Sequence, residues 1–204
     1  MTHFFLSNLT RRTFMTGLAS GAAMLGLSGL AQALTPATAK ALVNQVVDDI
    51  NTTISSGRSE SVMLQEFERI FERYADVQTI ALSALGPDRR RASQAQLRQY
   101  VDAFSYYLSR KYGRRFREFI GGRIEVQEAR AVRSFYEVQT TAILRGQAPF
   151  SVVFLVSDRS GRDLFFNIFI EGVNMLASER TEIGAMLDRR RGNIDALIQD
   201  LRRT

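Results

Sequence analysis

Apolar residues recur every three or four positions through the first half of the chain, as they do on one face of an amphipathic helix. The pattern breaks near Gly57, at Gly86 and Pro87, and at the paired glycines 121–122, which are residues that interrupt helices. It predicts helices over 37–55, from Ser59 or Ser61 onward, over Val77–Leu85, and from Gln94 to about Ile120. The last of these would be roughly 40 Å long at ~1.5 Å per residue, and it carries a broad aromatic face.

From about residue 123 the pattern becomes strand-like, with breaks at short turn sequences. It predicts strands at about 123–132, 134–145, 149–158 and 162–172, and then helices over Met175–Arg190 and Ile194–Leu201. Connections this short imply an antiparallel meander. The order predicts an α+β fold: a curved four-stranded antiparallel sheet with N-terminal helices, one long central helix and two C-terminal helices.

The last two predicted strands are apolar on both faces, whereas the first two alternate with glutamate and glutamine. In the final strand, period-two alternation puts Leu164, Phe166, Ile168 and Ile170 on one side and Phe165, Asn167 and Phe169 on the other. An antiparallel sheet backed by helices normally meets water on its second face. Either more protein covers that face, or the sheet and the long helix enclose a cavity for an apolar ligand, and the pattern alone leaves both interpretations open.

Residues 1–33 have the features of an export signal: paired Arg11 and Arg12, a Gly/Ala-rich apolar stretch, and a small-residue cleavage sequence at Ala31–Ala33. The arginine pair favours the twin-arginine route. Removing 33 of the 204 residues leaves 171, enough for one domain over 34–204. The signal holds two arginines and no acids, so the net charge falls from +6 to +4. We therefore expect a soluble, monomeric periplasmic protein that binds no nucleic acid.

Composition argues against catalysis. The one histidine, His3, lies in the predicted signal, and the chain has no cysteine, so the commonest general base, the thiol nucleophile and most transition-metal ligands are absent from the mature sequence. No metal or organic cofactor is expected. The arginine runs at 89–91, 114–117 and 189–191 are typical of solvated helix ends. Arg89, Arg90 and Arg91 follow a helix break, and they are the best candidates for contact with anionic headgroups or a membrane complex.

Three stretches resemble the MlaC family, also called the toluene-tolerance family of ABC-transporter auxiliary proteins. Residues 73–112 contain an aspartate, a short helix, Leu-Gly, a basic break and a Gln-x₃-Tyr-x₃-Phe helix. Residues 170–183 contain Glu-Gly-Val followed by Arg180, and 192–201 are similar to the closing helix of the family. Together these stretches extend the resemblance over essentially the whole mature chain.

The resemblance implies a periplasmic carrier that encloses phospholipid acyl chains in an apolar cavity between a cone-shaped, cystatin-like sheet and helices. Its partners would be phospholipid, an inner-membrane ABC transporter complex and an outer-membrane lipoprotein complex. The apolar residues predicted to contact lipid come from the long helix and the last two strands: Phe104, Tyr107, Leu108, Phe116, Phe119, Val153, Leu155, Phe166, Ile168 and Ile170.

Two other classes of function stay open at this point. A protein-binding periplasmic adaptor would have a collapsed interior with no room for a ligand. An enzyme built on a cone-shaped sheet would need a buried carboxylate as its base, for which Asp102 and Glu171 are the candidates.

Overall fold

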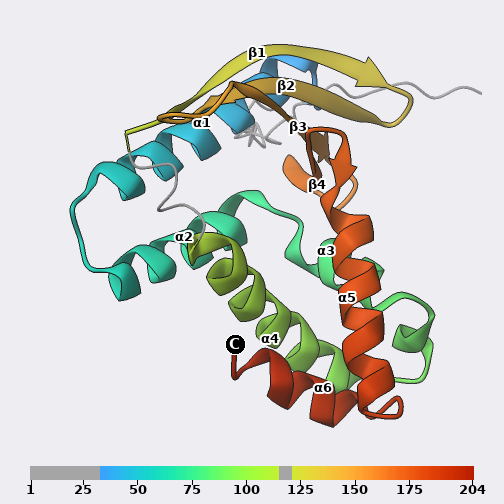
Figure 1. Ribbon diagram of the computed structural model, residues 1–204. Helices are drawn as coiled ribbons and strands as arrows, with labels where there is room; N and C mark the ends of the chain where they lie inside the picture. Colours follow the sequence, from blue (N-terminus) through green and yellow to red (C-terminus); the bar gives the residue numbers. More distant parts are fainter. Residues whose placement is uncertain (1–32, 115–120) are drawn as a thin grey trace, which may run out of the picture. The chain divides into compact units, whose positions relative to one another are not determined.

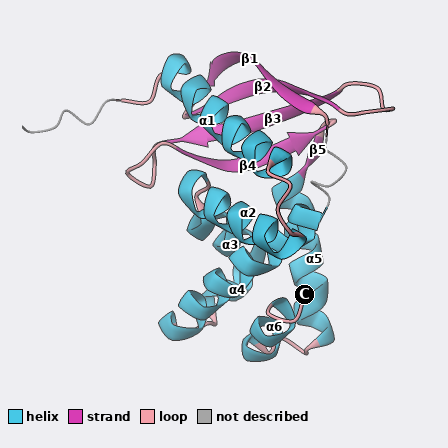
Figure 2. Cartoon of the chain, turned by 90° about the vertical axis from the view of Figure 1, so that its left-hand side faces the viewer, coloured by secondary structure: helices cyan, strands magenta, loops and turns pink. Residues whose placement is uncertain are grey.

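A computed structural model describes residues 33–114 and 121–204 of the chain. The described part is an α+β fold, as the sequence predicts, with helices before and after one antiparallel sheet (Figures 1 and 2). The helices are α1 Pro36–Ser55, α2 Glu60–Tyr74, α3 Val77–Leu85, the 3₁₀ helix η1 Gly86–Arg90, α4 Gln94–Gly113, α5 Met175–Arg189 and α6 Ile194–Leu201. The strands are β1 Arg123–Val132, β2 Phe135–Ile143, β3 Phe150–Ser157, β4 Leu164–Ile170 and β5 Val173–Asn174.

Local sequence fixes where the helices begin. Thr35 and Ser93 each form a capping box at the start of α1 and α4, with Thr38 and Gln96 as the reciprocal partners. The prediction that the long helix reaches Ile120 is tested only in part: α4 extends to Gly113, and 115–120 lie outside the described residues.

The sheet has the strand order β1-β2-β3-β4-β5, with antiparallel pairing throughout. The expectation of four strands is therefore wrong, because the chain pairs once more after β4. Glu171 and Gly172 both have positive φ, 47° and 78°. Two consecutive residues in that conformation make a two-residue hairpin turn, which pairs Ile170 with Val173 and begins β5.

A β-bulge in β4 also changes which residues share a face. Leu155 of β3 pairs with Asn167, but the next residue, Val156, pairs with Phe165, so Phe166 is the extra residue. The regular alternation predicted for 162–172 is thus broken. Phe165 lies on the same face as Ile168 and Ile170, with its ring edge-on to Phe154 at a centroid distance of 5.6 Å.

Helices cover one face of the sheet, which we call the inner face. Helix α1 packs along β1 and reaches β2 and β3, whereas α3 and α5 pack against β4 (Figure 1). Helix α4 lies away from the sheet and packs on α2, α3 and α6. A Cβ at Gly113 would lie 2.5 Å from the Leu64 side chain, so glycine is what allows the end of α4 to approach α2 so closely. Polar pairs such as Arg130 with Glu137 lie on the outer face of β1 and β2.

Candidate functional site

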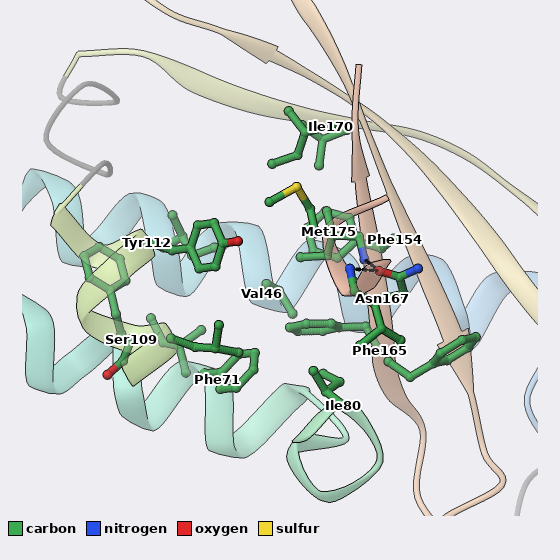
Figure 3. A pocket seen from close by; sticks show the side chains of 18 of the residues that line it. Val46, Phe71, Ile80, Ser109, Tyr112, Phe154, Phe165, Asn167, Ile170 and Met175 are labelled. Carbon is green, nitrogen blue, oxygen red and sulfur yellow. Dashed lines mark hydrogen bonds between the residues drawn. The ribbon is translucent and has the colours of Figure 1, made fainter. Parts of the chain in front are cut away.

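An apolar pocket lies between the inner face of the sheet and helices α1, α2, α3, α4 and α5 (Figure 3). The sheet contributes Ile124, Phe150, Val152, Phe154, Phe165, Phe166, Asn167, Ile168 and Ile170. The helices contribute Val46, Ile50, Phe67, Ile70, Phe71, Ile80, Leu108, Ser109, Tyr112, Gly113, Met175, Leu176 and Glu179. Its volume is about 200 Å³. Among these residues only Ser109, Tyr112, Asn167 and Glu179 carry polar side-chain atoms.

The register of β3 and β4 decides which side chains reach the pocket. Val152 pairs with Ile170, and Phe154 pairs with Ile168, so these four residues form a continuous apolar surface on the inner face. In Figure 3 Phe165 and Phe154 meet at the centre of this surface, and Met175 from the start of α5 approaches Ile170. Because strand neighbours point to opposite faces, Val153 and Leu155 are directed away from the pocket.

The structure brings together part of the predicted lipid-contact set. Leu108, Phe166, Ile168 and Ile170 line the pocket. Phe104 and Tyr107 are buried in a row of rings with Tyr100 outside the pocket wall, and Val153 and Leu155 are also absent from the wall. Phe116 and Phe119 lie outside the described residues. The role of all ten residues in lipid contact stays a prediction.

Sequence reasoning missed the contributions of α1 and α2. Val46 and Ile50 from α1, and Phe67, Ile70 and Phe71 from α2, line the pocket. The sequence does contain a signal for these residues, because those of α1 and those of α2 each belong to an apolar stripe at helical spacing. That stripe does not tell whether its residues contact protein or a ligand.

A hydrogen-bonded asparagine pair holds the start of α5 against β4. Asn167 is buried, and its Oδ1 accepts from the backbone N–H of Leu176 at 3.0 Å and from that of Ile168 at 2.8 Å. Its Nδ2 donates to Oδ1 of Asn174, 2.9 Å away, and this oxygen also caps α5 by accepting from the N–H of Ala177. The pair thereby fixes the helix turn that carries Met175 and Leu176 into the pocket wall.

Replacing Asn167 by leucine should therefore lower the free energy of unfolding by about 2 kcal/mol, because the part-buried N–H groups of Leu176 and Ile168 lose their acceptor. Chemical denaturation measures the change. Replacing the exposed Gln127 on the outer face by leucine serves as the control, and it should shift the free energy by less than about 0.5 kcal/mol. Equal effects of the two substitutions would contradict the structural role given to Asn167.

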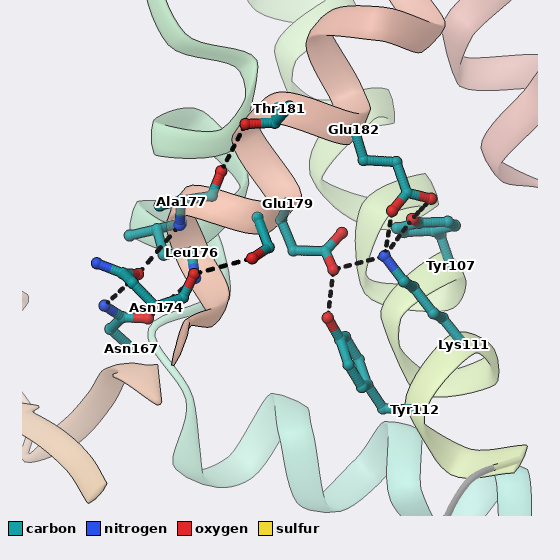
Figure 4. Close-up of polar contacts among 11 residues, drawn as sticks. Tyr107, Lys111, Tyr112, Asn167, Asn174, Leu176, Ala177, Glu179, Thr181 and Glu182 are labelled. Carbon is teal, nitrogen blue, oxygen red and sulfur yellow. Dashed lines mark hydrogen bonds and ion pairs between the residues drawn. The ribbon is translucent and has the colours of Figure 1, made fainter. Parts of the chain in front are cut away.

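Five polar side chains from α4 and α5 form a connected cluster beside the pocket, which we call the Lys111 network: Tyr107, Lys111, Tyr112, Glu179 and Glu182 (Figure 4). Lys111 Nζ donates to Oε1 of Glu179 at 2.7 Å, to Oε2 of Glu182 at 2.5 Å, and to the Tyr107 hydroxyl at 3.0 Å. Tyr107 donates to Oε1 of Glu182 at 2.7 Å, and Tyr112 donates to Oε1 of Glu179. The network joins α4 to α5.

Burial and the hydrogen bonds and charges of the network shift the pKa values of Tyr107 and Glu182. Burial raises the pKa of Tyr107, and its hydrogen bond to Glu182 and the charge of Glu179 raise it further. Burial acts to raise the pKa of Glu182 as well, but hydrogen bonds from Lys111 and Tyr107 outweigh it, and the net pKa is lowered. The Tyr107 phenol is therefore neutral and Glu182 is charged at neutral pH.

The basic residues predicted to contact a membrane or partner lie far from the pocket, at η1. Arg89 and Arg90 are exposed, and Arg91 forms an ion pair with Asp88. A guanidinium nitrogen of Arg91 is 3.1 Å from the position of a Cβ on Gly192, so this arginine borders the turn between α5 and α6. Contact of Arg89, Arg90 and Arg91 with a membrane or protein partner stays a prediction.

Two features are absent from the described residues, 33–114 and 121–204. These residues contain no group of His, Cys, Asp and Glu side chains arranged to hold a metal ion. None of their helices combines the length and the apolar character that a membrane span requires.

Fold and pocket together define a class of protein: an α+β domain that presents an apolar pocket between a curved antiparallel sheet and helices. The model of the MlaC protein family matches residues 40–203. The chain belongs to the MlaC family.

The structure is also similar to the phospholipid-binding protein from Ralstonia solanacearum, which was solved in complex with a phospholipid. The TM-score is 0.67 and the sequence identity 22%, over 80% of this chain and 94% of the other. At this identity the likeness concerns the fold. No curated protein matches the sequence of this chain.

Proposed function

We propose that this protein is a periplasmic lipid carrier, which holds phospholipid acyl chains in the apolar pocket and moves lipid between the outer and inner membranes. The observation that carries the proposal is the pocket itself, whose wall of aromatic and aliphatic side chains is interrupted by only four polar residues within the described ranges, 33–114 and 121–204. Family membership and the phospholipid complex of the Ralstonia protein support phospholipid as the ligand class. An inner-membrane ABC transporter and an outer-membrane lipoprotein complex would be the partners.

The energetics explain why such a carrier needs no catalytic group. Burying one CH₂ group is worth about 0.8 kcal/mol, so two chains with roughly thirty methylenes face a barrier on the order of 20 kcal/mol in water. A protein that shields the acyl chains from water between the two membranes removes most of that barrier. The pocket volume of about 200 Å³ is below the ~300–1,000 Å³ typical of ligand sites, so loading with a lipid requires the pocket to widen.

The carboxylates considered for an enzymatic function are poorly placed for it. Asp102 and Glu171 are both exposed, so neither is the buried base that the enzyme hypothesis needs. Glu179 is buried, but one of its carboxylate oxygens is occupied by Lys111 and Tyr112. We therefore propose a non-catalytic role.

Periplasmic location is part of the proposal, and it rests on the sequence of residues 1–33. Replacing Arg11 and Arg12 by lysine should block export, because the twin-arginine route requires the arginine pair. Cell fractionation with an antibody to the protein measures the outcome. Undiminished appearance of the lysine variant in the periplasm would contradict export by this route.

Lipid transfer between vesicles tests the carrier function. Donor vesicles contain a phospholipid with a self-quenching fluorescent acyl chain, and acceptor vesicles contain none. The protein should raise the rate of dequenching in proportion to its concentration, since each molecule carries lipid through the aqueous phase. A rate equal to that of vesicles alone, measured with folded protein, would refute the proposal.

A further inference from the structure

Two runs of three arginines that are far apart in the sequence meet at the end of α5 that lies away from the sheet (Figure 1). Residues 89–91 span the end of η1, and residues 189–191 span the end of α5. A Cβ at Gly192 would lie 3.1 Å from a guanidinium nitrogen of Arg91. The first turns of α4 and α6, which follow the two runs, are joined by a side-chain hydrogen bond of 3.1 Å. We call the surface formed by 89–91 and 189–191 the arginine patch.

Much of the positive charge of the arginine patch is left unpaired by neighbouring side chains. Two of its six arginines form ion pairs, Arg91 with Asp88 and Arg190 with Asp200. The other four are exposed and form no ion pair with any described residue: Arg89, Arg90, Arg189 and Arg191. The surrounding segments hold two more acids, Asp188 and Asp195, so six arginines face four aspartates. Hydrogen bonds from Arg190, and then charges that include that of Arg203, lower the pKa of Asp200, so a seventh arginine borders the patch.

Arg191 is held in a backbone conformation that most side chains disfavour. Its φ is 53°, and that of Gly192 is 76°. This turn ends α5 with a hydrogen bond of 3.0 Å from the N–H of Gly192 to the carbonyl oxygen of Leu187. Left-handed conformations are strained for residues other than glycine and asparagine, so either of those at 191 would form the turn more easily. Because strain of this kind gathers at functional sites, the arginine there favours a role for its guanidinium group outside the fold itself.

The surroundings of the patch fit a membrane surface better than a protein partner. Protein interfaces are usually centred on apolar or aromatic side chains. Among the described residues, Val173 is the only large apolar side chain that is exposed, and it lies in β5, at the other end of α5. A bilayer with anionic phospholipids instead offers phosphates over a plane, which exposed arginines bind without an apolar centre. Four unpaired guanidinium groups from two segments are suited to such a surface.

We propose that the arginine patch docks the protein on membranes that contain anionic phospholipid. The docking surface is separate from the pocket, so this inference does not depend on what the pocket binds. Each arginine near an anionic surface strengthens binding about fivefold, so the four unpaired ones together provide roughly 600-fold. The pocket is lined by residues at the start of α5, and the patch lies at its end. A docked molecule therefore has its pocket on the side away from the bilayer, free to meet a partner complex.

Co-sedimentation with vesicles tests the docking. One set of vesicles is phosphatidylcholine alone, and the other is equimolar phosphatidylcholine and phosphatidylglycerol. The wild-type protein should bind the second set more strongly, and the difference should disappear in high salt, which screens exposed charges. Arg89→Gln with Arg90→Gln should weaken binding to the anionic vesicles about 25-fold, and Arg189→Gln with Arg191→Gln should do the same, since each pair removes two unpaired charges.

The matched control removes two exposed arginines from turns of the sheet. Arg133 lies between β1 and β2, whereas Arg159 lies between β3 and β4 and donates to Oγ of Ser134 at 2.6 Å. Replacing both arginines by glutamine makes the same change in net charge away from the patch, so it should leave binding to the anionic vesicles unchanged. A loss equal to that of either patch pair would overturn the proposal, because binding would then follow net charge alone.

The other outcomes separate the docking from the carrier function. Equal binding of the wild-type protein to both sets of vesicles would overturn the docking and leave the carrier function standing. Retention on immobilised polyglutamate without binding to the anionic vesicles would also overturn it, and would assign the patch to an acidic protein partner. The variant with all four unpaired arginines replaced should transfer phosphatidylcholine between neutral vesicles at the wild-type rate, and a loss of transfer in this variant alone would overturn the separation of patch and pocket. Failure of the wild-type protein in that transfer would refute the carrier function and leave the docking standing.

Discussion

Replacing Ile168 by aspartate should reduce the affinity for phospholipid by roughly 100-fold. Ile168 lines the pocket and pairs with Phe154, so a carboxylate there would face bound acyl chains instead of water. Burying an unpaired polar group, such as a neutralised carboxyl, against hydrocarbon costs about 3 kcal/mol, and each 1.4 kcal/mol corresponds to a factor of ten in affinity. Because Ile168 is only half-buried without lipid, the variant should still fold.

The control is the same substitution on the neighbouring strand. Val153 is also half-buried, but it pairs with Phe169 and is absent from the pocket wall. Val153→Asp should therefore keep most of the lipid capture, as measured by extraction from vesicles. Loss in Val153→Asp alone would mean that the lipid lies against the other face of the sheet, and equal loss in both variants would contradict the assignment of lipid to the inner face.

Replacing Lys111 by methionine should lower the free energy of unfolding by about 3 kcal/mol, because it leaves the nearly buried Glu179 beside Glu182 with no cation between them. Urea denaturation measures the change. Adding Glu179→Gln to the Lys111→Met variant should restore part of the loss, since it removes one of the two uncompensated charges.

A surface pair provides the comparison for that experiment. Arg130 and Glu137 form an ion pair on the outer face of the sheet, where the arginine side chain is 64% exposed. Arg130→Met should cost less than about 1 kcal/mol. If Lys111→Met costs no more than Arg130→Met, the Lys111 network does not hold α4 against α5.

The sequence predicts the helices well because their ends carry strong local signals. Ser93 with Gln96 marks the start of α4, and Gly86 ends α3 with a φ of 64°. Each signal depends on residues within one turn of the boundary, so no knowledge of the tertiary structure is needed. The strand boundaries follow in the same way from short turns, with glycine at 146 between β2 and β3 and at 161 between β3 and β4, and Arg133-Ser134 between β1 and β2.

The arrangement of the last strands could not be derived from alternation. Phe165 and Phe166 are both aromatic, so a bulge between two apolar faces leaves no change in the hydrophobic pattern. The turn at Glu171 and Gly172 adds a strand only two residues long, too short for any periodicity. As a result the sequence does not determine which residues of β3 and β4 face the helices.

The Lys111 network could not be predicted from the sequence, for a different reason. Lys111 and Glu179 are 68 residues apart and meet only because α4 and α5 carry them to the same side of the pocket. The aromatic helix predicted over 94–120 and the apolar strands predicted at 149–158 and 162–172 favour an enclosed apolar ligand. They do not predict that a charged group borders it.

Native mass spectrometry of the mature protein purified under mild conditions tests the central claim most directly. We expect a species heavier than the polypeptide by the mass of a phospholipid, and release of that phospholipid on denaturation. Delipidated protein should regain this mass after incubation with phospholipid vesicles. A folded protein that has the mass of the bare polypeptide and takes up nothing from vesicles would contradict the account.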